Sequence, residues 1–561
     1  MSVNQHNTHT ERNSINEEHI YHLSPKQIET AISTSRKNHC TYSILMITLF
    51  FLANTSSYIS LTSIPIFYYE PQYLCSDQFG SFTKQCSKSF ICNDTHIRGY
   101  DYIDSPNNED LRSFITGLNI YCNKPKTVFL STCYFIGGLI GIILIPFLVS
   151  SIGCLNTIVL GYLVFFISSC FLSFITIYAM FVIMYILLNM SLSFLITCVP
   201  QYIIEMVDPT HRALFICLNF LSFGFSGYLS TLIAYKTKDY KYVIAASAAI
   251  TLVIGVVIKF VLIDSVRTNF IQGKQKEIIR NLEYVAKMNK SQLEFKVWKD
   301  TQNQSQLKQY HNISSSSSSS STSNNKYNAV SFLSIFKYSS QNKLIILFSL
   351  VSFSVNYALL LVQLEITKHN KFFTALAWAF TCDIIGLVIG CFSAEISVLK
   401  RKYSFLSINI ALIVTYFIAG ISFNKQYTIM FIVHRVFVYA LFGNYTLYNF
   451  EVYPTMTRPI GVSINRIFAR VFNLWTPYLM ISAPRWGYFL GVVFTGIIIA
   501  MIFLFELPET KNEVIKEFPR EVEKDVIGKK NDDYINNEED EDVLIKDDGE
   551  DDNEQNEFHE K

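Results

Sequence analysis

The chain has 561 residues, of which 50% are hydrophobic and only 16% are charged, whereas an ordinary soluble domain carries about 25% charged residues. Its long apolar stretches exclude a soluble globular protein. The net charge of +1 conceals an acidic end, because residues 531–561 hold 15 acidic and 2 basic residues, a balance of −13 that leaves +14 for the rest. Most of that positive charge lies beside or between apolar stretches, which indicates membrane topology rather than nucleic-acid binding.

Twelve stretches are apolar and long enough to cross a membrane, since a spanning helix needs about 20 mostly apolar residues. The polar tail 1–41 precedes them and lacks the apolar core of a cleaved signal peptide. The sequence therefore predicts an all-α integral membrane protein with two six-span halves, 42–263 and 344–506. The predicted spans are 42–66, 127–149, 154–174, 177–199, 213–235, 241–263, 344–364, 372–397, 403–423, 427–449, 460–482 and 486–506.

A polar loop, 67–126, separates the first two spans. It holds four cysteines and a glycosylation sequon that begins at Asn93. Four cysteines in one loop predict two disulfides with three possible pairings, and both disulfides and glycans form on the extracytoplasmic side. The alternative is four free thiols in a cytoplasmic loop. The four residues are Cys75, Cys86, Cys92 and Cys122.

A second polar segment, 264–343, links the two halves. Its first part has helical spacing, and its second part contains the serine run 314–321, which is typical of a flexible insert. Basic residues in this linker and near Arg401 place it, with both termini, in the cytoplasm by the positive-inside rule. The acidic tail 507–561 follows the last span, and its far end is expected to be solvated. We expect a plasma-membrane protein, although an endosomal or vacuolar membrane also fits.

The two halves share a short repeat. Residues 205–212 follow the fourth span and residues 451–458 follow the tenth, and each segment places a glutamate seven positions before an arginine across a Pro-Thr pair. Short internal repeats of this kind are typical of transporters built from two parallel repeats. We expect these charges to form ion pairs at a cytoplasmic gate. They are Glu205, Arg212, Glu451 and Arg458.

Five tracts match, in order, those of a known family. They are Phe67-Tyr-Tyr-Glu-Pro71 before Cys75, Leu118-Asn-Ile-Tyr-Cys122, segment 264–289, the run from Tyr448 to Arg458, and Leu507-Pro-Glu-Thr-Lys511. Through these tracts the chain resembles the organic cation, organic anion and carnitine transporter family of the major facilitator superfamily. The resemblance covers most of residues 42–518. It implies the major facilitator fold, twelve transmembrane helices in two six-helix halves, and solute transport by alternating access.

The chain departs from this family in the loop after the second span. Ser150 stands where an acid is expected, and Cys154-Leu155 stands where a basic pair belongs. The equivalent loop of the second half keeps Glu395, which we assign to the gate. Arg466, near the cytoplasmic end of the eleventh span, is assigned to the gate as well.

Buried charges need a reason, because a charged side chain inside a span costs at least about 2.5–3.5 kcal/mol. The resemblance places Asp383 where many members carry a cavity-facing glutamate; the alternative is a structural carboxylate bonded to a neighbouring helix. It places Arg470 where anion and carnitine carriers tend to have arginine. Since guanidinium suits carboxylate binding, Arg470 favours an anionic or zwitterionic substrate over a cation; the alternative is an arginine paired within the bundle.

Three other residues are weighed in the same way. Tyr357 and Phe442 match aromatic positions that line the family's cavity, where ring faces attract cations; either could instead pack against lipid or helix. His434, next to Arg435 in the tenth span, could couple transport to protons, but a satisfied helix contact is the commoner role.

No phosphate-binding glycine loop and no metal-binding His or Cys spacing occurs, so we expect neither an enzyme nor an ATP-driven pump, and no cofactor or metal. The expected partners are a small organic ion and the lipid bilayer, with the coupling ion unknown and no nucleic acid. One alternative is a sugar or polyol porter, which would have an amide-rich cavity and no long cysteine loop. Another is a non-transporting receptor or scaffold on the same fold, which the altered loop at Ser150 favours.

Overall fold

The computed structural model describes most of the helical bundle, while the first 39 residues, Asn93, the serine run and the acidic end lie outside the described residues. For the strands, and for parts of some helices, it describes the backbone alone. The described residues are 40–70, 73–76, 82–86, 92, 100–102, 111–207, 211–271, 274–290, 339–365, 372–395, 400–422, 428–455, 457–482, 484–505 and 507–510.

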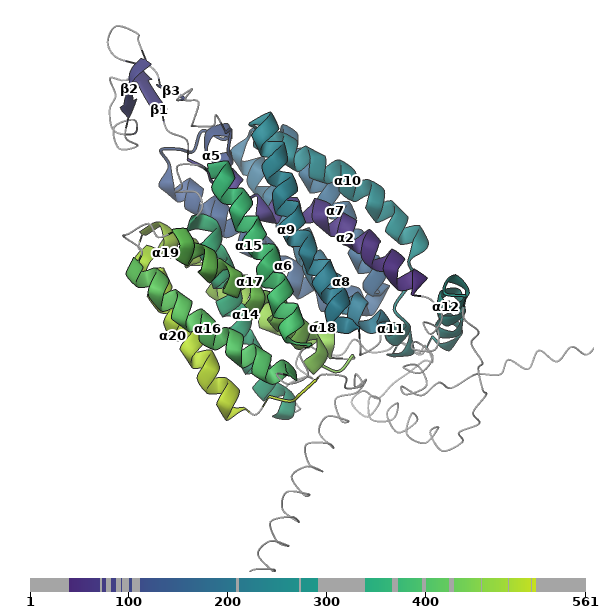
Figure 1. Cartoon of the computed structure of the whole chain (residues 1–561). Coiled ribbons are helices and arrows are strands. Elements are labelled where there is room, and N and C mark those ends of the chain that lie inside the picture. Colours follow the sequence, from purple (N-terminus) through teal and green to yellow (C-terminus); the bar gives the residue numbers. More distant parts are fainter. Residues whose placement is uncertain are drawn as a thin grey trace, which may run out of the picture.

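Long helices form both halves of the molecule (Figure 1). In lipid a helix satisfies all its own backbone hydrogen bonds, so apolar stretches of this length fold as helices. The first half contains α2 (Thr41–Thr62), α3 (Ile64–Phe67), α6 (Lys124–Ile152), α7 (Cys154–Phe174), α8 (Tyr178–Met206), α9 (Arg212–Thr237) and α10 (Tyr240–Val261). The second half contains α14 (Ser339–Glu365), α15 (Phe372–Ser393), α16 (Lys400–Ser422), α17 (Thr428–Val452), α18 (Arg458–Phe472), α19 (Thr476–Ser482) and α20 (Pro484–Leu504).

Within the described residues, ten helices are long and apolar enough to cross a membrane. The predicted spans 427–449 and 460–482 are not among them. The first falls on α17, which is long but carries several polar side chains. The second is not one continuous helix, because α18 ends at Phe472 and α19 begins at Thr476. The count of twelve spans stays a prediction at these two places.

Asn473 explains the break between α18 and α19. Its amide group donates to the carbonyl of Ala469 at 2.8 Å and to that of Phe353 at 3.2 Å, and its Oδ1 accepts from the Thr476 hydroxyl at 2.9 Å. A buried asparagine that bonds nearby backbone competes with helix continuation. The sequence did not predict this break, because residues 460–482 are mostly apolar.

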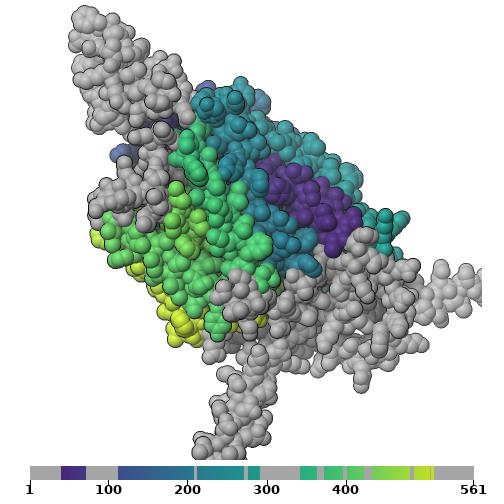
Figure 2. Space-filling view, in the orientation of Figure 1, coloured from purple at the N-terminus to yellow at the C-terminus, as the bar shows by residue number. Residues whose placement is uncertain are grey.

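The two halves repeat the same packing scheme. In the first half α2 packs against α9, α6 against α8 and α7 against α10, and in the second half α14 packs against α18, α15 against α17 and α16 against α20. Glycines allow the closest of these approaches, since a Cβ at Gly141 would meet the Met190 carbonyl oxygen and one at Gly390 would overlap that of Ala440. Across the halves α9 packs against α15 and α6 against α18; Figure 2 shows the surfaces of α9 and α15 side by side.

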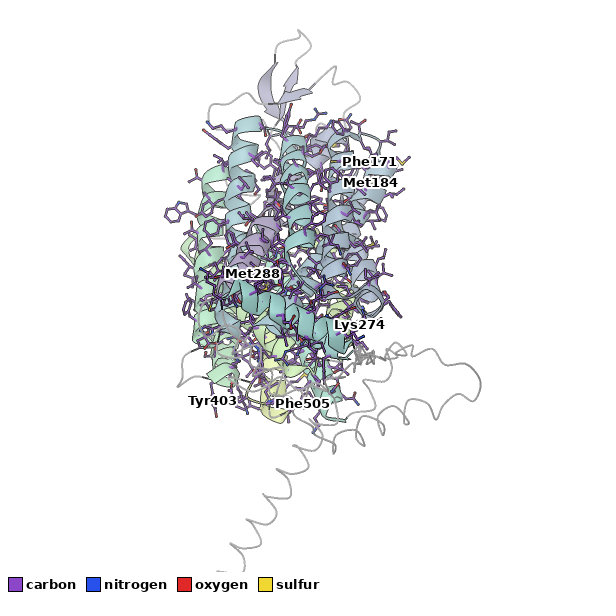
Figure 3. All side chains as sticks on the ribbon, turned by 90° about the vertical axis from the view of Figure 1, so that its right-hand side faces the viewer. Phe171, Met184, Lys274, Met288, Tyr403 and Phe505 are labelled. Carbon is purple, nitrogen blue, oxygen red and sulfur yellow. A yellow bond between two sulfur atoms is a disulfide. The ribbon has the colours of Figure 1, made fainter. Side chains whose placement is uncertain are left out.

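Large apolar side chains remain exposed on the outer surface of the bundle. Phe260 is 83% exposed, Phe174 82% and Trp486 67%, and Figure 3 shows Phe171 on the outer edge of the bundle. Such a continuous apolar exterior requires a lipid environment.

The loop between α3 and α6 contains a small antiparallel sheet, which the all-α prediction missed. Its strand order is β2-β1-β3, and Tyr73 of β1 pairs with Cys86 of β2 and Tyr102 of β3. The elements of this loop are β1 (Tyr73–Ser76), β2 (Phe82–Cys86), β3 (Tyr100–Tyr102) and α5 (Phe114–Gly117). We call the end of the bundle next to this sheet the sheet end.

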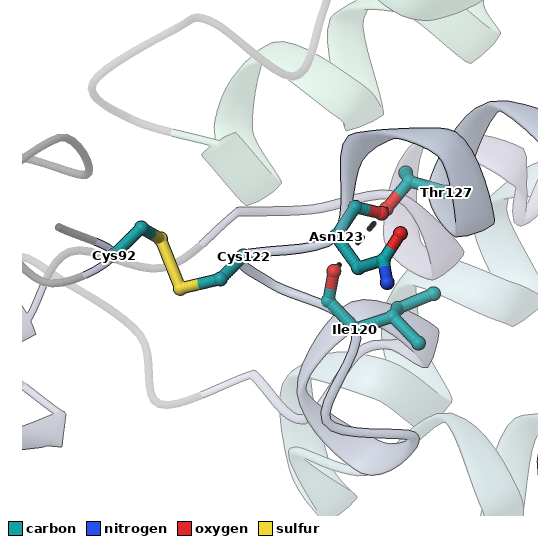
Figure 4. Close-up of a disulfide and its surroundings, with 5 residues drawn as sticks. All are labelled: Cys92, Ile120, Cys122, Asn123 and Thr127. Carbon is teal, nitrogen blue, oxygen red and sulfur yellow. Dashed lines mark hydrogen bonds between the residues drawn. A yellow bond between two sulfur atoms is a disulfide. The ribbon is translucent and has the colours of Figure 1, made fainter.

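A disulfide joins Cys92 to Cys122, which lies just before α6 (Figure 4). Cys75 and Cys86 lie in β1 and β2, and their side chains are not described. The opposite end of the bundle carries the linker helices α11 (Val266–Ile271) and α12 (Gln275–Met288). We call it the linker end.

Candidate functional site

A cavity lies between the two halves. It contains about 930 Å³ of space unoccupied by atoms, part of it open to solvent. Seven helices line it, α2, α6, α8 and α9 from the first half and α14, α17 and α18 from the second, together with Ile64 of α3. The lining residues are Leu61, Thr62, Ile64, Tyr134, Phe135, Ile142, Ser193, Ile196, Phe223, Ser352, Val355, Asn356, Leu359, Leu360, Tyr439, Phe442, Tyr445, Arg466 and Arg470.

Arg470 of α18 lies in this cavity wall and is 8% exposed. Its guanidinium carbon lies 4.6 Å from the ring centre of Tyr134 and 5.6 Å from that of Phe135. The missing side chain of Gly138 makes room for it, because a Cβ there would lie 3.0 Å from Arg470 Nε. Among the described residues Arg470 has no ion-pair partner, and its buried Nη1 has no hydrogen-bond partner. The arginine therefore faces the cavity and not a described carboxylate.

Arg466 lies one turn before Arg470 and lines the same cavity. Its Nη1 donates to the Thr197 hydroxyl of α8 at 2.6 Å, and its guanidinium lies 5.7 Å from the ring of Phe450. No aspartate or glutamate is among the described lining residues. The cavity wall thus carries two positive charges and no described negative charge.

Phe442 of α17 is part of the cavity wall, together with a group of other rings. Its ring centre lies 5.1 Å from that of Phe220 and 5.5 Å from that of Phe223, both in edge-to-face arrangements. Because these contacts join α9 to α17, the ring cluster belongs to both halves. It offers an organic ligand an apolar, aromatic surface.

Tyr357 does not line the cavity. Its hydroxyl donates to the carbonyl of Gly487 at 2.8 Å, and its ring packs near Phe494 and Trp475. The side chain is fully buried within the second half. The geometry fits the packing alternative rather than the cavity role that the resemblance implied.

Asp383 is also not among the described cavity-lining residues. Arg435 binds it in the two-bond arrangement that a guanidinium and a carboxylate favour. Arg435 Nε lies 2.5 Å from Oδ1 and Nη2 lies 2.7 Å from Oδ2, while Nη1 donates to the Val362 carbonyl at 3.0 Å. Both side chains are buried. The geometry fits the alternative of a structural carboxylate. The sequence did not predict that Arg435 would be the partner of Asp383.

His434 is packed within the second half. Its Nδ1 lies 3.1 Å from the Thr415 hydroxyl, and its ring lies 4.4 Å from that of Tyr416 and 5.8 Å from that of Tyr488. It is not among the cavity-lining residues. This placement fits a helix contact.

The ion pair between Glu205 and Arg458 joins α8 of the first half to the start of α18 in the second. The two groups lie 3.5 Å apart and are fully buried. Glu205 also accepts from the Gln201 amide at 3.0 Å and from the Thr268 hydroxyl of α11 at 2.9 Å. The pair connects the halves at the linker end, beyond the cavity, and we call it the inner gate after the gate role that the sequence predicts for it.

Glu451 pairs with Arg401, at 2.9 Å, within its own half. Arg401 also approaches Glu395 at 3.6 Å. The repeat partner Arg212 is buried as well. Burial disfavours the ionised form of Glu451, and the charges of Arg401 and Arg212 oppose that effect. These charges therefore form a cluster at the linker end. Arg401 lies between Glu395 and Glu451 in this cluster, but the sequence did not predict it as a gate residue.

A carboxylate after the last span of each half caps a helix at the linker end. Glu509 accepts from the backbone N–H of Arg401 at 3.1 Å, at the start of α16. Asp264 accepts from the backbone N–H of Leu155 at 3.2 Å, at the start of α7. It lies against Gly153, whose φ of +89° suits glycine. Burial raises the pKa of Asp264. This carboxyl group lies beside the loop in which Ser150 stands where an acid was expected.

A family model described as Major Facilitator Superfamily matches residues 115–471. Two curated relatives are similar over most of the chain. Solute carrier family 22 member 6-A of Xenopus laevis is 22% identical over 78% of this chain and 76% of its own length. Solute carrier family 22 member 7 of Rattus norvegicus is 22% identical over 70% and 71%, respectively. The resemblance to organic-ion transporters is confirmed as a distant similarity.

Solved structures of the xylose transporter XylE share the fold. One, a proton:xylose symporter bound to 6-bromo-6-deoxy-D-glucose, has a TM-score of 0.60 and 13% identity, and covers 88% of this chain and 99% of its own. A partially occluded inward-open form from E. coli has a TM-score of 0.54 and 12% identity, and covers 86% and 99%. At these identities the match describes the arrangement of helices alone.

Proposed function

The chain belongs to the Major Facilitator Superfamily, a family of membrane transporters and not of enzymes, and we propose that it carries small organic anions or zwitterions by alternating access. The observation that carries the proposal is the pair Arg466 and Arg470 in the wall of a cavity that has no described carboxylate. We also propose that the linker end faces the cytoplasm and that the protein resides in the plasma membrane.

A buried guanidinium without a partner is costly in a membrane protein, so a ligand that supplies the negative charge gains a strong interaction. Arginine presents a planar fork of donors that matches a carboxylate in two hydrogen bonds. The buried Nη1 of Arg470, which has no described partner, is such a donor. A cation would meet two repelling charges and no described carboxylate. The charge pattern therefore favours anions over cations.

The rest of the wall supports an organic ligand. Aromatic and aliphatic side chains make up most of it, as in most small-molecule sites. An apolar or aromatic body could pack against Phe442 and Phe223 while its acidic group reaches Arg470. Aromatic carboxylates are the simplest compounds of this shape.

The arrangement of the cross-half bonds supports alternating access. The inner gate and the bond from Arg466 to Thr197 both connect α8 to α18. Opening the linker end requires both to break, and a ligand that engages Arg466 would compete for one of them. Substrate binding and gate opening would thereby be coupled through one helix.

The structure supports the two alternative functions, a sugar porter and a non-transporting receptor, less well. A sugar porter needs several hydrogen-bonding amides, and the described lining contains a single one, Asn356. A non-transporting receptor was favoured by the altered loop at Ser150, but Asp264 provides a carboxylate beside that loop. Similarity to a xylose symporter at 13% identity concerns the fold only.

The proposal is tested by uptake into oocytes of a labelled aromatic carboxylate, carnitine, tetraethylammonium and xylose. We expect uptake of the carboxylate or carnitine, abolished in Arg470→Asp at equal surface expression. Lys124→Asp, a basic-to-acidic change at an exposed position outside the cavity, serves as a control for general damage and should transport as the wild type does. If surface-expressed wild-type protein moves only xylose, or none of the four, the organic-ion assignment is refuted.

A further inference from the structure

The linker helix α12 has one buried face and one basic face. Ile278, Leu282 and Val285 are buried against the bundle. At about 100° per residue, the exposed side chains of Lys276, Arg280 and Lys287 fall within about 40° of one another, on the opposite side of the helix. Glu283 is the acid on that face, and Lys290 follows at its end. The exposed face therefore carries a net positive charge.

Specific contacts fix α12 on the flank of the bundle. The Tyr42 backbone N–H donates to Asn289 Oδ1 at 2.9 Å, the Asn281 amide to the Asp264 carbonyl at 3.1 Å, and the Tyr284 hydroxyl to the Val261 carbonyl at 3.2 Å. Figure 1 shows α12 beyond the ends of α2 and α10. Figure 3 shows it across the bundle, roughly perpendicular to the long helices, with Lys274 and Met288 at its two ends.

The neighbouring end of α10 faces lipid. Phe260 is 83% exposed and Val256 49%, and the bilayer core must cover such side chains in a chain of this family. Tyr284 bonds to Val261, the residue after Phe260. The helix α12 consequently lies where the apolar surface of α10 ends, at the level of the lipid headgroups of that leaflet.

We propose that the basic face of α12, defined by Lys276, Arg280 and Lys287, binds anionic lipid headgroups of the leaflet at the linker end. An amphipathic helix at the interface, with basic residues on its polar face, is attracted to anionic lipid. Each such residue strengthens binding about fivefold at a charged leaflet. This surface is separate from the cavity, so the proposal does not depend on the transported solute.

The helix also connects this surface to the inner gate. Lys274, at the start of α12, donates its backbone N–H to the carbonyl of Asn269 in α11 at 3.0 Å. The adjacent Thr268 donates to Glu205 of the gate at 2.9 Å. Lipid bound to α12 would therefore restrain the helix that supports the closed gate.

The test uses the full chain in nanodiscs and measures the preference of spin-labelled phosphatidylserine over phosphatidylcholine for the protein boundary. We expect a preference for phosphatidylserine that is lost in the triple variant Lys276→Glu, Arg280→Glu, Lys287→Glu. The matched control, Lys124→Glu, Lys126→Glu, Lys236→Glu, changes the net charge equally at exposed positions near the sheet end and should retain the preference. A second triple variant with glutamine at the α12 positions should also lose it and guards against effects of the new acids on folding.

Equal lipid preference in wild type and both α12 variants would overturn the proposal. The acidic residues 531–561 are the competing partner for the basic face. If the wild type shows the preference only after deletion of 531–561, the tail and not lipid occupies the face in the intact chain, and the proposal is also overturned.

Discussion

At the scale of single residues, two buried arginines of similar exposure have different surroundings. Arg435 is saturated by Asp383 and by backbone carbonyls, whereas the described contacts of Arg470 are with rings and its Nη1 is unpaired. Residue type could not distinguish them. The partner of Asp383 lies 52 positions away in sequence, so only the fold identifies which charge is neutralised and which faces the cavity.

Removing one partner of the Asp383–Arg435 pair should damage stability. Asp383→Asn leaves the Arg435 charge buried, which typically costs about 3–5 kcal/mol. The double variant Asp383→Leu, Arg435→Leu should recover much of this loss, because no uncompensated charge remains. Thermal unfolding of the purified protein in detergent measures both. A selective loss of substrate affinity in Asp383→Asn at unchanged melting temperature would instead return Asp383 to the binding site.

The inner gate predicts a rescue by charge exchange. Glu205→Arg or Arg458→Glu alone should place two like charges in a buried contact and abolish most uptake. The two together should restore part of it, because the attraction between α8 and α18 returns. Uptake at equal surface expression is the readout. An exchange variant as inactive as the single variants would show that the hydrogen bonds from Gln201 and Thr268, and not the ion pair, hold Glu205 in its role.

At the scale of elements, glycine positions decide how closely helices approach. A Cβ at Gly390 of α15 would overlap the Ala440 carbonyl oxygen of α17, whereas a Cβ at Gly496 of α20 would meet only Ile413 at 3.6 Å. Gly390→Ala should therefore lower the melting temperature. Gly496→Ala, the matched control, should leave it unchanged or raise it slightly, since alanine favours helix by up to about 1 kcal/mol. Equal effects of the two would contradict the close packing of α15 and α17.

The positions of the elements, though not all of their ends, were predicted where apolar length alone determines them. The spans of the first half lie on α2, α6, α7, α8, α9 and α10 as expected. The prediction failed where one polar residue interrupts an apolar run, as Asn473 does between α18 and α19. It also missed the sheet of β1, β2 and β3, because those short strands depend on pairing between segments and not on a local apolar pattern.

The caps formed by Asp264 and Glu509 were only partly visible in the sequence. Both lie in tracts that match the family, but no local pattern shows that each reaches the start of a helix more than a hundred residues away. The structure pairs them as equivalent features of the two halves. This equivalence supports the repeat that Glu205 and Glu451 first indicated.

At the scale of the whole molecule, the disulfide ties the loop at the sheet end to the start of α6. Cys92 and Cys122 are separated by 30 positions, and closing a loop of that length stabilises a fold by about 3–4 kcal/mol in the chain-entropy account. The variant Cys92→Ser, Cys122→Ser should lower the melting temperature in non-reducing buffer. Reducing agent should lower the wild type towards the same value, and no difference between variant and wild type would contradict the bond.

The two halves meet around the cavity, and this arrangement could be predicted only in outline. The repeat and the family resemblance predicted two similar halves and placed Phe442 and Arg470 at their junction. They also placed Tyr357 and Asp383 there, but both side chains point into the second half. A match at a sequence position specifies the helix and its depth, whereas the direction of a side chain depends on its neighbours.

The most direct test of the account is the affinity of purified protein for a transported aromatic carboxylate, such as benzoate, in wild type, Arg470→Lys and Arg470→Gln. A hydrogen bond to a charged group contributes about 1.5–3 kcal/mol, so we predict at least about tenfold weaker binding in Arg470→Gln and an intermediate affinity in Arg470→Lys. The neutral benzamide should bind all three proteins weakly and alike. Unchanged carboxylate affinity in Arg470→Gln, with the protein folded, would contradict the assignment of Arg470 as the anion-binding residue of the cavity.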